Sequence, residues 1–458
     1  MHTIAAVSTP HGKGGIAVIR VSGDAALDVA GRVFAPASGK NVADLPARFA
    51  AFGTIHTLSG DVLDTGVCTT FHGPASFTGE DVCELSCHGG TFVTASVLSA
   101  VLAAGAALAE PGEFTKRAFL AGKLSLTEAE AVGRLIDADT EERMKLSSGA
   151  VRGVVSEKLR QIREPLFDVM TALYAAMDYP EEDVGDEGET QIAGVVHRAL
   201  AGVRGLLSTY KTGRAVAEGV KTVICGRPNA GKSSLFNRLT GEEAAIVTQV
   251  AGTTRDILRQ VVSFGGVTLR LSDTAGLRET GDVVEQIGVD RAAREIAGAE
   301  LVIGVFDPTA GLSAEEREMV SAYPACPRIA VVNKADTGAA FGEKDLAYLA
   351  EHHEKVIAVS CATGEGLDEL SAAVASLWGS DRLEVGRDAV IWDIRQHAAL
   401  TRAEAYLADA AYALDTGDAL DAICTLCESA LAALDETDGR SVNGEIVDAI
   451  FARFCVGK

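Results

Sequence analysis

The chain has 458 residues, which predicts roughly two to four domains, because a single core seldom exceeds ~250–300 residues. Its 47% hydrophobic and 23% charged residues are those of an ordinary globular protein with a large core. A formal net charge of −23 argues against broad, nonspecific coating of nucleic acid or of an anionic membrane, since phosphate contacts need clustered Lys and Arg.

Nine cysteines are scattered along the chain, and this odd, dispersed set does not form a disulfide framework. We therefore expect a reducing cytoplasm. Cys424 and Cys427 form a C-x-x-C pair, but no second pair accompanies them. Positions i and i+3 of a helix share a face, so we expect two buried helix residues rather than a metal or redox site. Residues 1–15 lack a basic region followed by an apolar run, and no signal peptide is predicted.

Residues 1–121 are predicted to form an α+β domain. Residues 4–8 and 16–21 have the composition of strands, and a glycine-rich turn joins them. Residues 81–87 predict a further strand, in which alternation places Glu84 on a mixed face that can line a cleft. A lone acid on a strand is usually solvated, so the pattern alone assigns it no function.

Residues 91–109 contain no charged side chain over a length that nearly spans a bilayer. Most of them are Ala, Ser, Thr and Gly, the bulkier residues fall at helical spacing, and no Lys or Arg flanks the segment. We expect a packed core helix rather than a membrane span.

Helical patterns begin within residues 111–138 and persist to about residue 214. Thr127 with Glu130 matches a capping box, after which an apolar stripe follows. The stripe consists of Ala129, Val132, Leu135 and Ile136. The acidic stretch 178–189 is expected to be a solvated loop. Helical patterning returns from Trp392 to Phe454, with a break near Thr416 and Gly417. We therefore expect one all-α domain into which another domain is inserted.

Residues 221–240 contain the motif around which the chain is organised, KTVICGRPNAGKSSLFNRLT. A short apolar strand over 222–225 leads into a glycine-rich loop and then a helix beginning near Ser234. Such a loop cradles phosphates, because glycines turn backbone N–H groups inward, the helix N-terminus adds positive potential and Lys232 reaches the outer phosphates. Ser233 is expected to bind Mg²⁺. The predicted loop consists of Gly226, Arg227, Pro228, Asn229, Ala230, Gly231, Lys232 and Ser233.

Three further motifs each follow a predicted strand. After strand 267–271, an acid able to hold Mg²⁺ through water precedes a backbone N–H for a γ-phosphate, which indicates a nucleoside triphosphate. After strand 329–332, Asp336 can accept from the N1–H and 2-amino group of guanine. After strand 356–359, the backbone offers an edge for the base carbonyl. The motif residues are Asp273, Thr274, Ala275 and Gly276; Asn333, Lys334, Ala335 and Asp336; and Ser360, Cys361 and Ala362.

In order and spacing, the four motifs resemble those of Ras-like GTPases. Alternating strands and helices therefore predict a doubly wound, mostly parallel sheet over about residues 219–380. In Ras-type GTPases a Gln just after the second motif orients the attacking water, but this chain has Leu277 after Gly276. An apolar residue cannot position water, and Glu279, Asp282 and Glu285 all remain candidates for that role. Thr253 and Thr254 lie where a switch segment closes over Mg²⁺ and the γ-phosphate.

The chain resembles the MnmE family of tRNA-modification GTPases, also called TrmE, over nearly its whole length. The resemblance is carried by STPHGKGGIAVIRVSG, GPASFTGEDVCELSCHGG, PGEFTKRAFLAGKLSLTEAEAV, GRPNAGKSSLFN, AGTTRD, DTAGLRET and FCVGK. It implies an N-terminal folate-binding and dimerisation domain (1–121) and an all-α helical domain (122–218 and 381–458). The inserted Ras-like α/β GTPase domain covers 219–380.

The resemblance also implies a homodimer, K⁺-stimulated GTP hydrolysis and a partner, the flavoprotein MnmG, in a heterotetramer. Together such proteins install an aminomethyl or carboxymethylaminomethyl group at carbon 5 of the wobble uridine, position 34, of certain tRNAs. The implied cofactors are GTP or GDP, Mg²⁺, K⁺ and 5-formyl- or 5,10-methylene-tetrahydrofolate. No membrane association is implied.

Several residues match the functional positions of the family. The resemblance puts K⁺ at Asn229, Thr248, Val250 and Thr253, Mg²⁺ at Ser233 and Thr254, and the nucleotide also near Gln249, Ala251 and Gly252. Glu285 matches the catalytic acid. The folate contacts are matched by Arg20, Glu84, Lys123 and Lys458. Cys455 matches the C-terminal cysteine of the family. A functional role for this thiol and an incidental presence are about equally supported.

Two other classes of GTPase remain as alternatives. A regulatory or ribosome-assembly GTPase normally brings an RNA-binding appendage, such as a GXXG segment in a basic context, which this acidic chain does not clearly show. A membrane-remodelling GTPase needs a basic amphipathic or lipidated element, and Cys455 is followed by Val-Gly-Lys instead of a prenylation signal. The leading hypothesis is a GTPase of a tRNA-modifying complex, in which GTP-state dimerisation of the nucleotide domains drives rearrangement at a folate site. The sequence leaves open the tRNAs modified, ammonium or glycine as donor, and partner docking.

Overall fold

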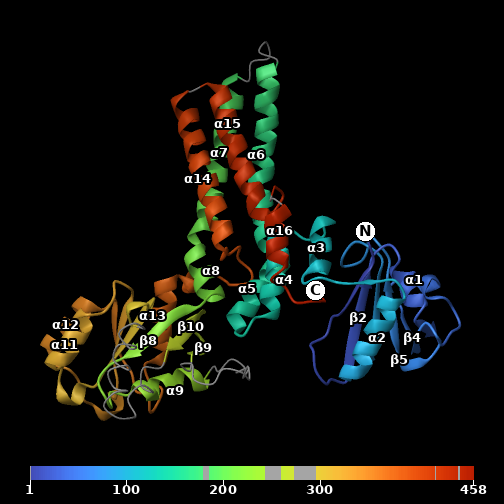
Figure 1. Cartoon of the computed structure of the whole chain (residues 1–458). Coiled ribbons are helices and arrows are strands. Elements are labelled where there is room, and N and C mark those ends of the chain that lie inside the picture. The colour runs from blue at the N-terminus through green and yellow to red at the C-terminus, as the bar shows by residue number, and fades with distance from the viewer. Residues whose placement is uncertain are drawn as a thin grey trace. The chain divides into compact units, whose positions relative to one another are not determined.

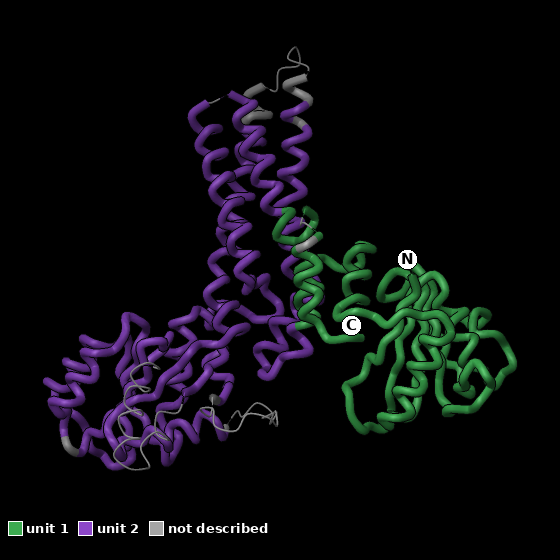
Figure 2. The backbone as a smooth tube through the Cα atoms, in the orientation of Figure 1, with its two compact units in different colours: residues 1–133, 435–458 green, residues 134–434 purple. Residues whose placement is uncertain are grey.

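A computed structural model of the chain describes residues 2–178, 185–242, 259–272, 296–417, 419–441 and 444–457. The chain divides into two compact units, residues 1–133 with 435–458 and residues 134–434 (Figure 2). The first unit therefore contains both ends of the chain. The domain boundaries expected near residues 121, 218 and 380 stay predictions.

The described strands of the first unit form a seven-stranded sheet with the order β3-β4-β5-β6-β2-β1-β7. They are β1 (Ile4–Val7), β2 (Ile16–Ser22), β3 (Phe34–Pro36), β4 (Ala50–His56), β5 (Val62–Phe71), β6 (Val82–His88) and β7 (Ala107–Leu108). Neighbours are antiparallel except β1 and β7, which run parallel. The predicted strands near residues 4, 16 and 81 are all present.

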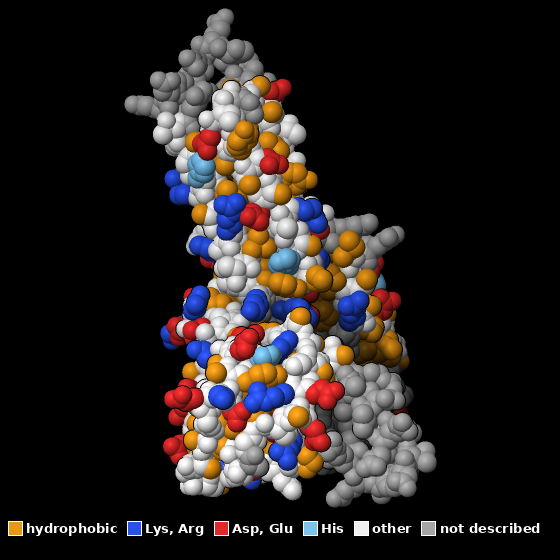
Figure 3. All heavy atoms as spheres, turned by 90° about the vertical axis from the view of Figure 1, so that its left-hand side faces the viewer, with side chains coloured by type: hydrophobic (Ala, Val, Ile, Leu, Met, Phe, Trp, Pro, Cys, Tyr) orange, Lys and Arg blue, Asp and Glu red, His pale blue; other side chains and the backbone are white. Residues whose placement is uncertain are grey.

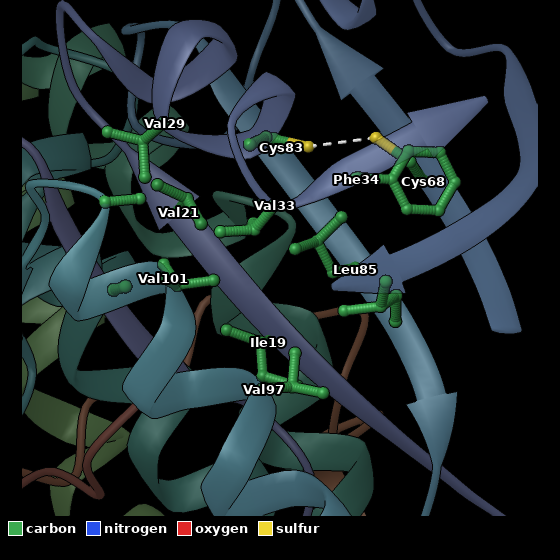
Figure 4. Close-up of a cluster of buried hydrophobic side chains, with 14 of the residues drawn as sticks. Ile19, Val21, Val29, Val33, Phe34, Cys68, Cys83, Leu85, Val97 and Val101 are labelled. Atoms are coloured by element: carbon green, nitrogen blue, oxygen red, sulfur yellow. Dashed lines mark hydrogen bonds between the residues drawn. The ribbon is translucent and has the colours of Figure 1, made fainter. Parts of the chain in front are cut away.

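One face of this sheet packs against α1 (Ala26–Gly31) and α2 (Thr91–Ala103). Strand alternation sends Ile19 and Leu85 into this core, where they meet Val97 of α2 (Figure 4). Fully burying a side chain of this kind stabilises the fold by about 1.5–3 kcal/mol. The uncharged segment is thus a packed core helix, as expected. Among the described helices, none is long and apolar enough to cross a membrane.

The start of α4 (Leu126–Ile136) differs from the prediction, because Ser125 rather than Thr127 caps it. The Glu128 backbone N–H donates to Ser125 Oγ at 3.1 Å, and the Ser125 N–H donates to Glu128 Oε2 at 2.9 Å. Thr127 is buried and donates its hydroxyl to the Thr437 carbonyl at 3.3 Å.

Packing decides between two overlapping capping patterns. Leu126 and Ala129 are buried with Val447 and Phe451, so the earlier pattern is the one that places Leu126 inside the helix. Within the predicted apolar stripe, Ala129 is buried but Ile136 is exposed. Val447 and Phe451 belong to α16 (Gly444–Phe451), while α3 (Glu113–Leu120) also contacts α16.

The described strands of the second unit form a six-stranded sheet with the order β13-β12-β11-β8-β10-β9. They are β8 (Val220–Cys225), β9 (Arg259–Phe264), β10 (Val267–Ser272), β11 (Leu301–Phe306), β12 (Arg328–Val332) and β13 (Lys355–Ala358). β9 and β10 are antiparallel and the other neighbours parallel. With α9 (Lys232–Glu242), α11 (Ala314–Ser321), α12 (Glu343–His352) and α13 (Leu367–Trp378), they confirm the predicted doubly wound fold.

The remaining helices of the second unit come from both sides of this sheet in the sequence. They are α5 (Glu141–Val151), α6 (Val154–Asp178), α7 (Gly185–Ser208), α8 (Tyr210–Ala217), α14 (Ile394–Thr416) and α15 (Leu420–Asp438). α7 packs against both α6 and α14, and α15 lies beside them (Figure 1). An all-α region interrupted by the α/β region was the arrangement expected from the helical patterns.

Two details concern helix ends. Gly417 ends α14 in a left-handed conformation with φ of 73°, at the predicted break. α7 begins at Gly185, so the acidic stretch 178–189 is not a loop throughout. Carboxylates are favourable in the first turn of a helix as well as in solvated loops, so charge alone did not separate the two.

On the face seen in Figure 3, Lys and Arg are interspersed with Asp and Glu.

Candidate functional site

The glycine-rich loop follows β8 and ends where α9 begins, at Lys232. Gly226 and Gly231 have φ of +147° and +104°, values that side chains other than glycine rarely adopt. A Cβ at Gly226 would overlap the carbonyl oxygen of Val305, and one at Gly231 would overlap the side-chain amide of Asn333. The loop is therefore packed closely against Val305 and Asn333 at its two glycines.

Asn333 joins three of the four predicted nucleotide motifs. It is 4% exposed, and its Nδ2 donates to the Ala230 carbonyl in the glycine-rich loop at 2.9 Å. Its Oδ1 accepts from the Cys361 backbone N–H at 3.1 Å. The carboxyl ends of β8, β12 and β13 therefore meet at one site, where ligands bind in doubly wound sheets.

Asp336 is held in a fixed orientation. The Ser360 hydroxyl donates to Asp336 Oδ1 at 2.6 Å, and the Thr363 backbone N–H donates to Ser360 Oγ at 3.2 Å. A carboxylate fixed in this way can accept the paired donors of guanine. Burial raises the pKa of the neighbouring Cys361 thiol to about 11, so the thiol is neutral at physiological pH.

The loop also contains the predicted ligands of phosphate and metal ions. Lys232 Nζ donates to the Arg227 carbonyl at 2.7 Å, within its own loop. Ser233 is exposed in the first turn of α9. Asn229 is exposed in the left-handed region with φ of 63°, and Pro228 precedes it. The expected binding of Mg²⁺ at Ser233 and of K⁺ at Asn229 stays a prediction.

Many of the predicted site residues lie outside the described part of the chain. They are Thr248, Gln249, Val250, Ala251, Gly252, Thr253, Thr254, Asp273, Thr274, Ala275, Gly276, Glu279, Asp282, Glu285 and Lys458. Two described strands adjoin these residues in the sequence. β9 begins at Arg259, directly after residues 243–258, and β10 ends at Ser272, directly before residues 273–295.

A second site lies in the first unit, on the sheet face opposite α1 and α2. Arg20 of β2 and Glu84 of β6 are cross-strand partners. Arg20 donates to Glu84 Oε1 from Nε at 2.9 Å and from Nη2 at 2.8 Å. The guanidinium carbon lies 5.6 Å from the Phe77 ring centroid and 5.7 Å from that of Phe114. Two rings and a carboxylate therefore fix the guanidinium.

Lys123 belongs to the same neighbourhood. A Cβ on Gly79 would lie 3.5 Å from Lys123 Cε, so the lysine stem packs along the loop that contains Phe77. The structure thus brings Arg20, Glu84 and Lys123 to one region of the first unit. Phe77 and Phe114 were not among the predicted site residues, although both occur in the stretches GPASFTGED and PGEFTKR.

The C-terminal motif runs along the edge of this region. The Gly112 backbone N–H donates to the Cys455 carbonyl at 3.3 Å, and Val456 pairs with Pro111 in an isolated β-bridge. Cys455 itself is exposed. All nine cysteines are free thiols, and Cys424 and Cys427 are buried in α15 as expected.

Comparisons with known proteins cover the whole chain. Residues 3–123 match the family model described as "GTP-binding protein TrmE N-terminus", and residues 126–455 match that of the "MnmE helical domain". The chain belongs to the MnmE family. The "tRNA modification GTPase MnmE" of Symbiobacterium thermophilum is 42% identical over 459 residues, which cover 100% of this chain and 99% of that protein. The protein of the same name from Moorella thermoacetica is 42% identical over 461 residues, with the same coverage.

Solved structures of GTP-binding proteins resemble part of the chain. A variant of Era from Aquifex aeolicus is 25% identical, covers 40% of this chain and 65% of that chain, and has a TM-score of 0.28. The G domain of FeoB from T. maritima is 28% identical, covers 34% of this chain and 98% of that one, and has a TM-score of 0.26. As an MnmE family member, the chain is a GTPase of tRNA modification that binds GTP or GDP with Mg²⁺.

Proposed function

We propose that this MnmE family member hydrolyses GTP with stimulation by K⁺ and acts with the flavoprotein MnmG in a heterotetramer. Together they install an aminomethyl or carboxymethylaminomethyl group at carbon 5 of uridine 34 in certain tRNAs. The carbon comes from 5-formyl- or 5,10-methylene-tetrahydrofolate bound to the first unit. The protein works as a homodimer in the cytoplasm. Full-length likeness to proteins named tRNA modification GTPase supports this assignment.

The arrangement around Arg20 and Glu84 carries the folate part of the proposal. A pterin is a flat ring with N–H donors along one edge, and a carboxylate such as Glu84 accepts two such donors. The partly exposed ring of Phe77 supplies apolar surface for a flat ligand next to the guanidinium, and the buried ring of Phe114 supports the guanidinium from the core. Arg20 orients the Glu84 carboxylate, and Lys123 provides positive charge suited to the carboxylates of a folate tail.

The nucleotide site supports a cation-assisted mechanism. Asn229 presents its side chain from an exposed, left-handed position of the phosphate-binding loop. A monovalent cation next to the β- and γ-phosphates would supply the positive charge that an arginine finger supplies elsewhere. We expect the kcat for GTP to fall at least tenfold when Na⁺ replaces K⁺ at equal ionic strength. Equal rates in the two salts would contradict the cation role.

Nucleoside analysis of tRNA tests the function as a whole. A strain that lacks this protein is expected to lose the carbon-5 group of the wobble uridine, and a plasmid copy of the wild-type gene is expected to restore it. Chromatography with mass spectrometry of digested tRNA measures both. Unchanged modification would reject the pathway and favour a regulatory or ribosome-assembly GTPase, a class without a role in base chemistry.

A further inference from the structure

Asp307 stands at the guanine end of the nucleotide site although it belongs to none of the four nucleotide motifs. It is the first residue after β11, which pairs with β8 on one side and β12 on the other. Phe306 lies opposite Val332, and the Asn333 backbone N–H donates to the Phe306 carbonyl at 2.9 Å. Asp307 is therefore next to the loop that contains Asn333, Lys334 and Asp336.

Both carboxylate oxygens of Asp307 accept hydrogen bonds. Oδ2 accepts from Lys334 Nζ at 2.5 Å, and Oδ1 accepts from the Thr309 backbone N–H at 3.0 Å and its hydroxyl at 2.7 Å. Partial burial raises the pKa of Asp307, but the hydrogen bonds from Lys334 and Thr309 outweigh it and lower the pKa to about 2. The carboxylate is thus charged at neutral pH and held from both sides.

Lys334 needs such an anchor. Its φ of 65° and ψ of 34° lie in the left-handed region, which a lysine occupies only where the surroundings fix it. The chain turns at this residue into the short 3₁₀ helix Ala335–Thr337, and Asp336 lies within that helix. The conformation of Lys334 therefore sets the direction in which Asp336 points.

Four side-chain hydrogen bonds connect the guanine motif to its surroundings. Asn333 donates to the Ala230 carbonyl and accepts from the Cys361 backbone N–H, Ser360 donates to Asp336, and Lys334 donates to Asp307. The first three lie within the four nucleotide motifs. The fourth connects the guanine motif to the residue after β11, which the four motifs do not include.

We propose that Asp307 is a positioning residue of the guanine-nucleotide site, which holds Lys334 and so fixes the loop that presents Asp336 to the base. The base is common to GTP and GDP. Loss of Asp307 therefore weakens both nucleotides by the same factor and leaves the chemical step unchanged, so the KM for GTP rises while the kcat does not fall.

The sign of the effect separates this proposal from its converse. If Lys334 had to leave Asp307 in order to bind the nucleotide, the ion pair would compete with binding. Removal of the carboxylate would then tighten binding rather than weaken it. Positioning and competition therefore predict opposite changes in the dissociation constant.

The test uses D307N in the full chain, with a fluorescent N-methylanthraniloyl derivative of GDP and of GTP as probes. We expect the dissociation constants for both to rise about tenfold and by the same factor. The kcat at saturating GTP is expected to stay within about twofold of wild type. In a K334M background, D307N should add no further loss, because the two residues act as one unit.

D345N is a matched control. The Arg317–Asp345 pair has the same separation of 2.5 Å and the same side-chain exposures of 37% and 22% as the Lys334–Asp307 pair, and it lies in the same unit. Its residues belong to no nucleotide motif, so D345N is expected to bind both probes like wild type. Unchanged or tighter binding by D307N, an equal loss in D345N, or a fall in kcat would each overturn the proposal.

Discussion

The hydroxyl of Ser8 donates a hydrogen bond of 3.0 Å to the carbonyl oxygen of Gly457, which lies 449 residues further along the chain. Ser8 directly follows β1, and Ala6 of that strand lies opposite Arg20 of β2. The end of the chain is therefore built into the first unit and runs along the strand next to Arg20. This contact places Gly457 of the terminal FCVGK motif beside the proposed folate pocket.

G457V should displace this terminal motif. Gly457 has φ of +95°, and a Cβ there would overlap the carbonyl oxygen of Val7. We expect at least a tenfold loss of affinity for 5-formyl-tetrahydrofolate in calorimetric titration. V456I is the matched control, because Val456 is 47% exposed and the change keeps its shape. Wild-type affinity in G457V would show that the terminal motif is not needed by the pocket.

F451A should destabilise the first unit. Phe451 is 1% exposed, and its ring centroid lies 5.2 Å from that of Phe454 and 6.1 Å from that of Phe119. Deleting a buried aromatic ring typically costs about 3–5 kcal/mol. Denaturant unfolding followed by circular dichroism should show that the first unit unfolds at a lower denaturant concentration than in wild type. F92A, at a side chain that is 84% exposed, should unfold like wild type. Similar shifts in both variants would contradict the packing described for α16.

Alkylation should distinguish the cysteines. Cys455 is exposed, whereas burial raises the pKa of Cys427 to about 11 and that of Cys225 to about 12. The thiolate is the reactive form, so a raised pKa lowers reactivity at every pH below that value. Iodoacetamide at pH 8 should therefore modify Cys455 first in the native protein, as peptide mass spectrometry can show. Alkylation of Cys427 as fast as Cys455 would contradict the burial of α15.

E285A should abolish turnover and spare binding. Loss of a residue that positions water or moves a proton typically costs 10²–10⁴-fold in rate. We expect a fall in kcat of at least ~100-fold, with GTP affinity within about threefold of wild type. E279Q and D282N, at the two other candidate acids, serve as controls and should retain turnover. If E285A turned over GTP normally and one of the two controls did not, the catalytic role would belong to the acid replaced in that control.

The geometry of the glycine-rich loop was easier to predict from the sequence than the arrangement around Arg20, because the loop depends on local spacing. The glycine-rich loop, its strand and its helix are contiguous, so Gly226 and Gly231 identified the fold directly. Arg20 and Glu84 lie 64 residues apart, and only the pairing of β2 with β6 places them opposite each other. Strand alternation placed Glu84 on the sheet face away from α1 and α2, but it could not show that Arg20 lies opposite Glu84.

Contacts between distant segments also explain the errors. Two capping patterns overlapped near Ser125 and Thr127, and the burial of Leu126 against α16 selected between them. No local signal marked Phe77 and Phe114 as neighbours of the Arg20 guanidinium, because both contacts form only in the folded unit. The role of Asp307 depends likewise on a side chain 27 residues away.

We propose that a folate pocket in the first unit serves the same base modification as the GTPase in the second. The wobble-uridine content of tRNA, from a strain whose only copy of this protein carries R20M, tests this connection. We expect the carbon-5 group to be lost, as in the deletion strain, while purified R20M protein still binds GTP. Full modification in the R20M strain would show that the modification does not depend on the Arg20 site.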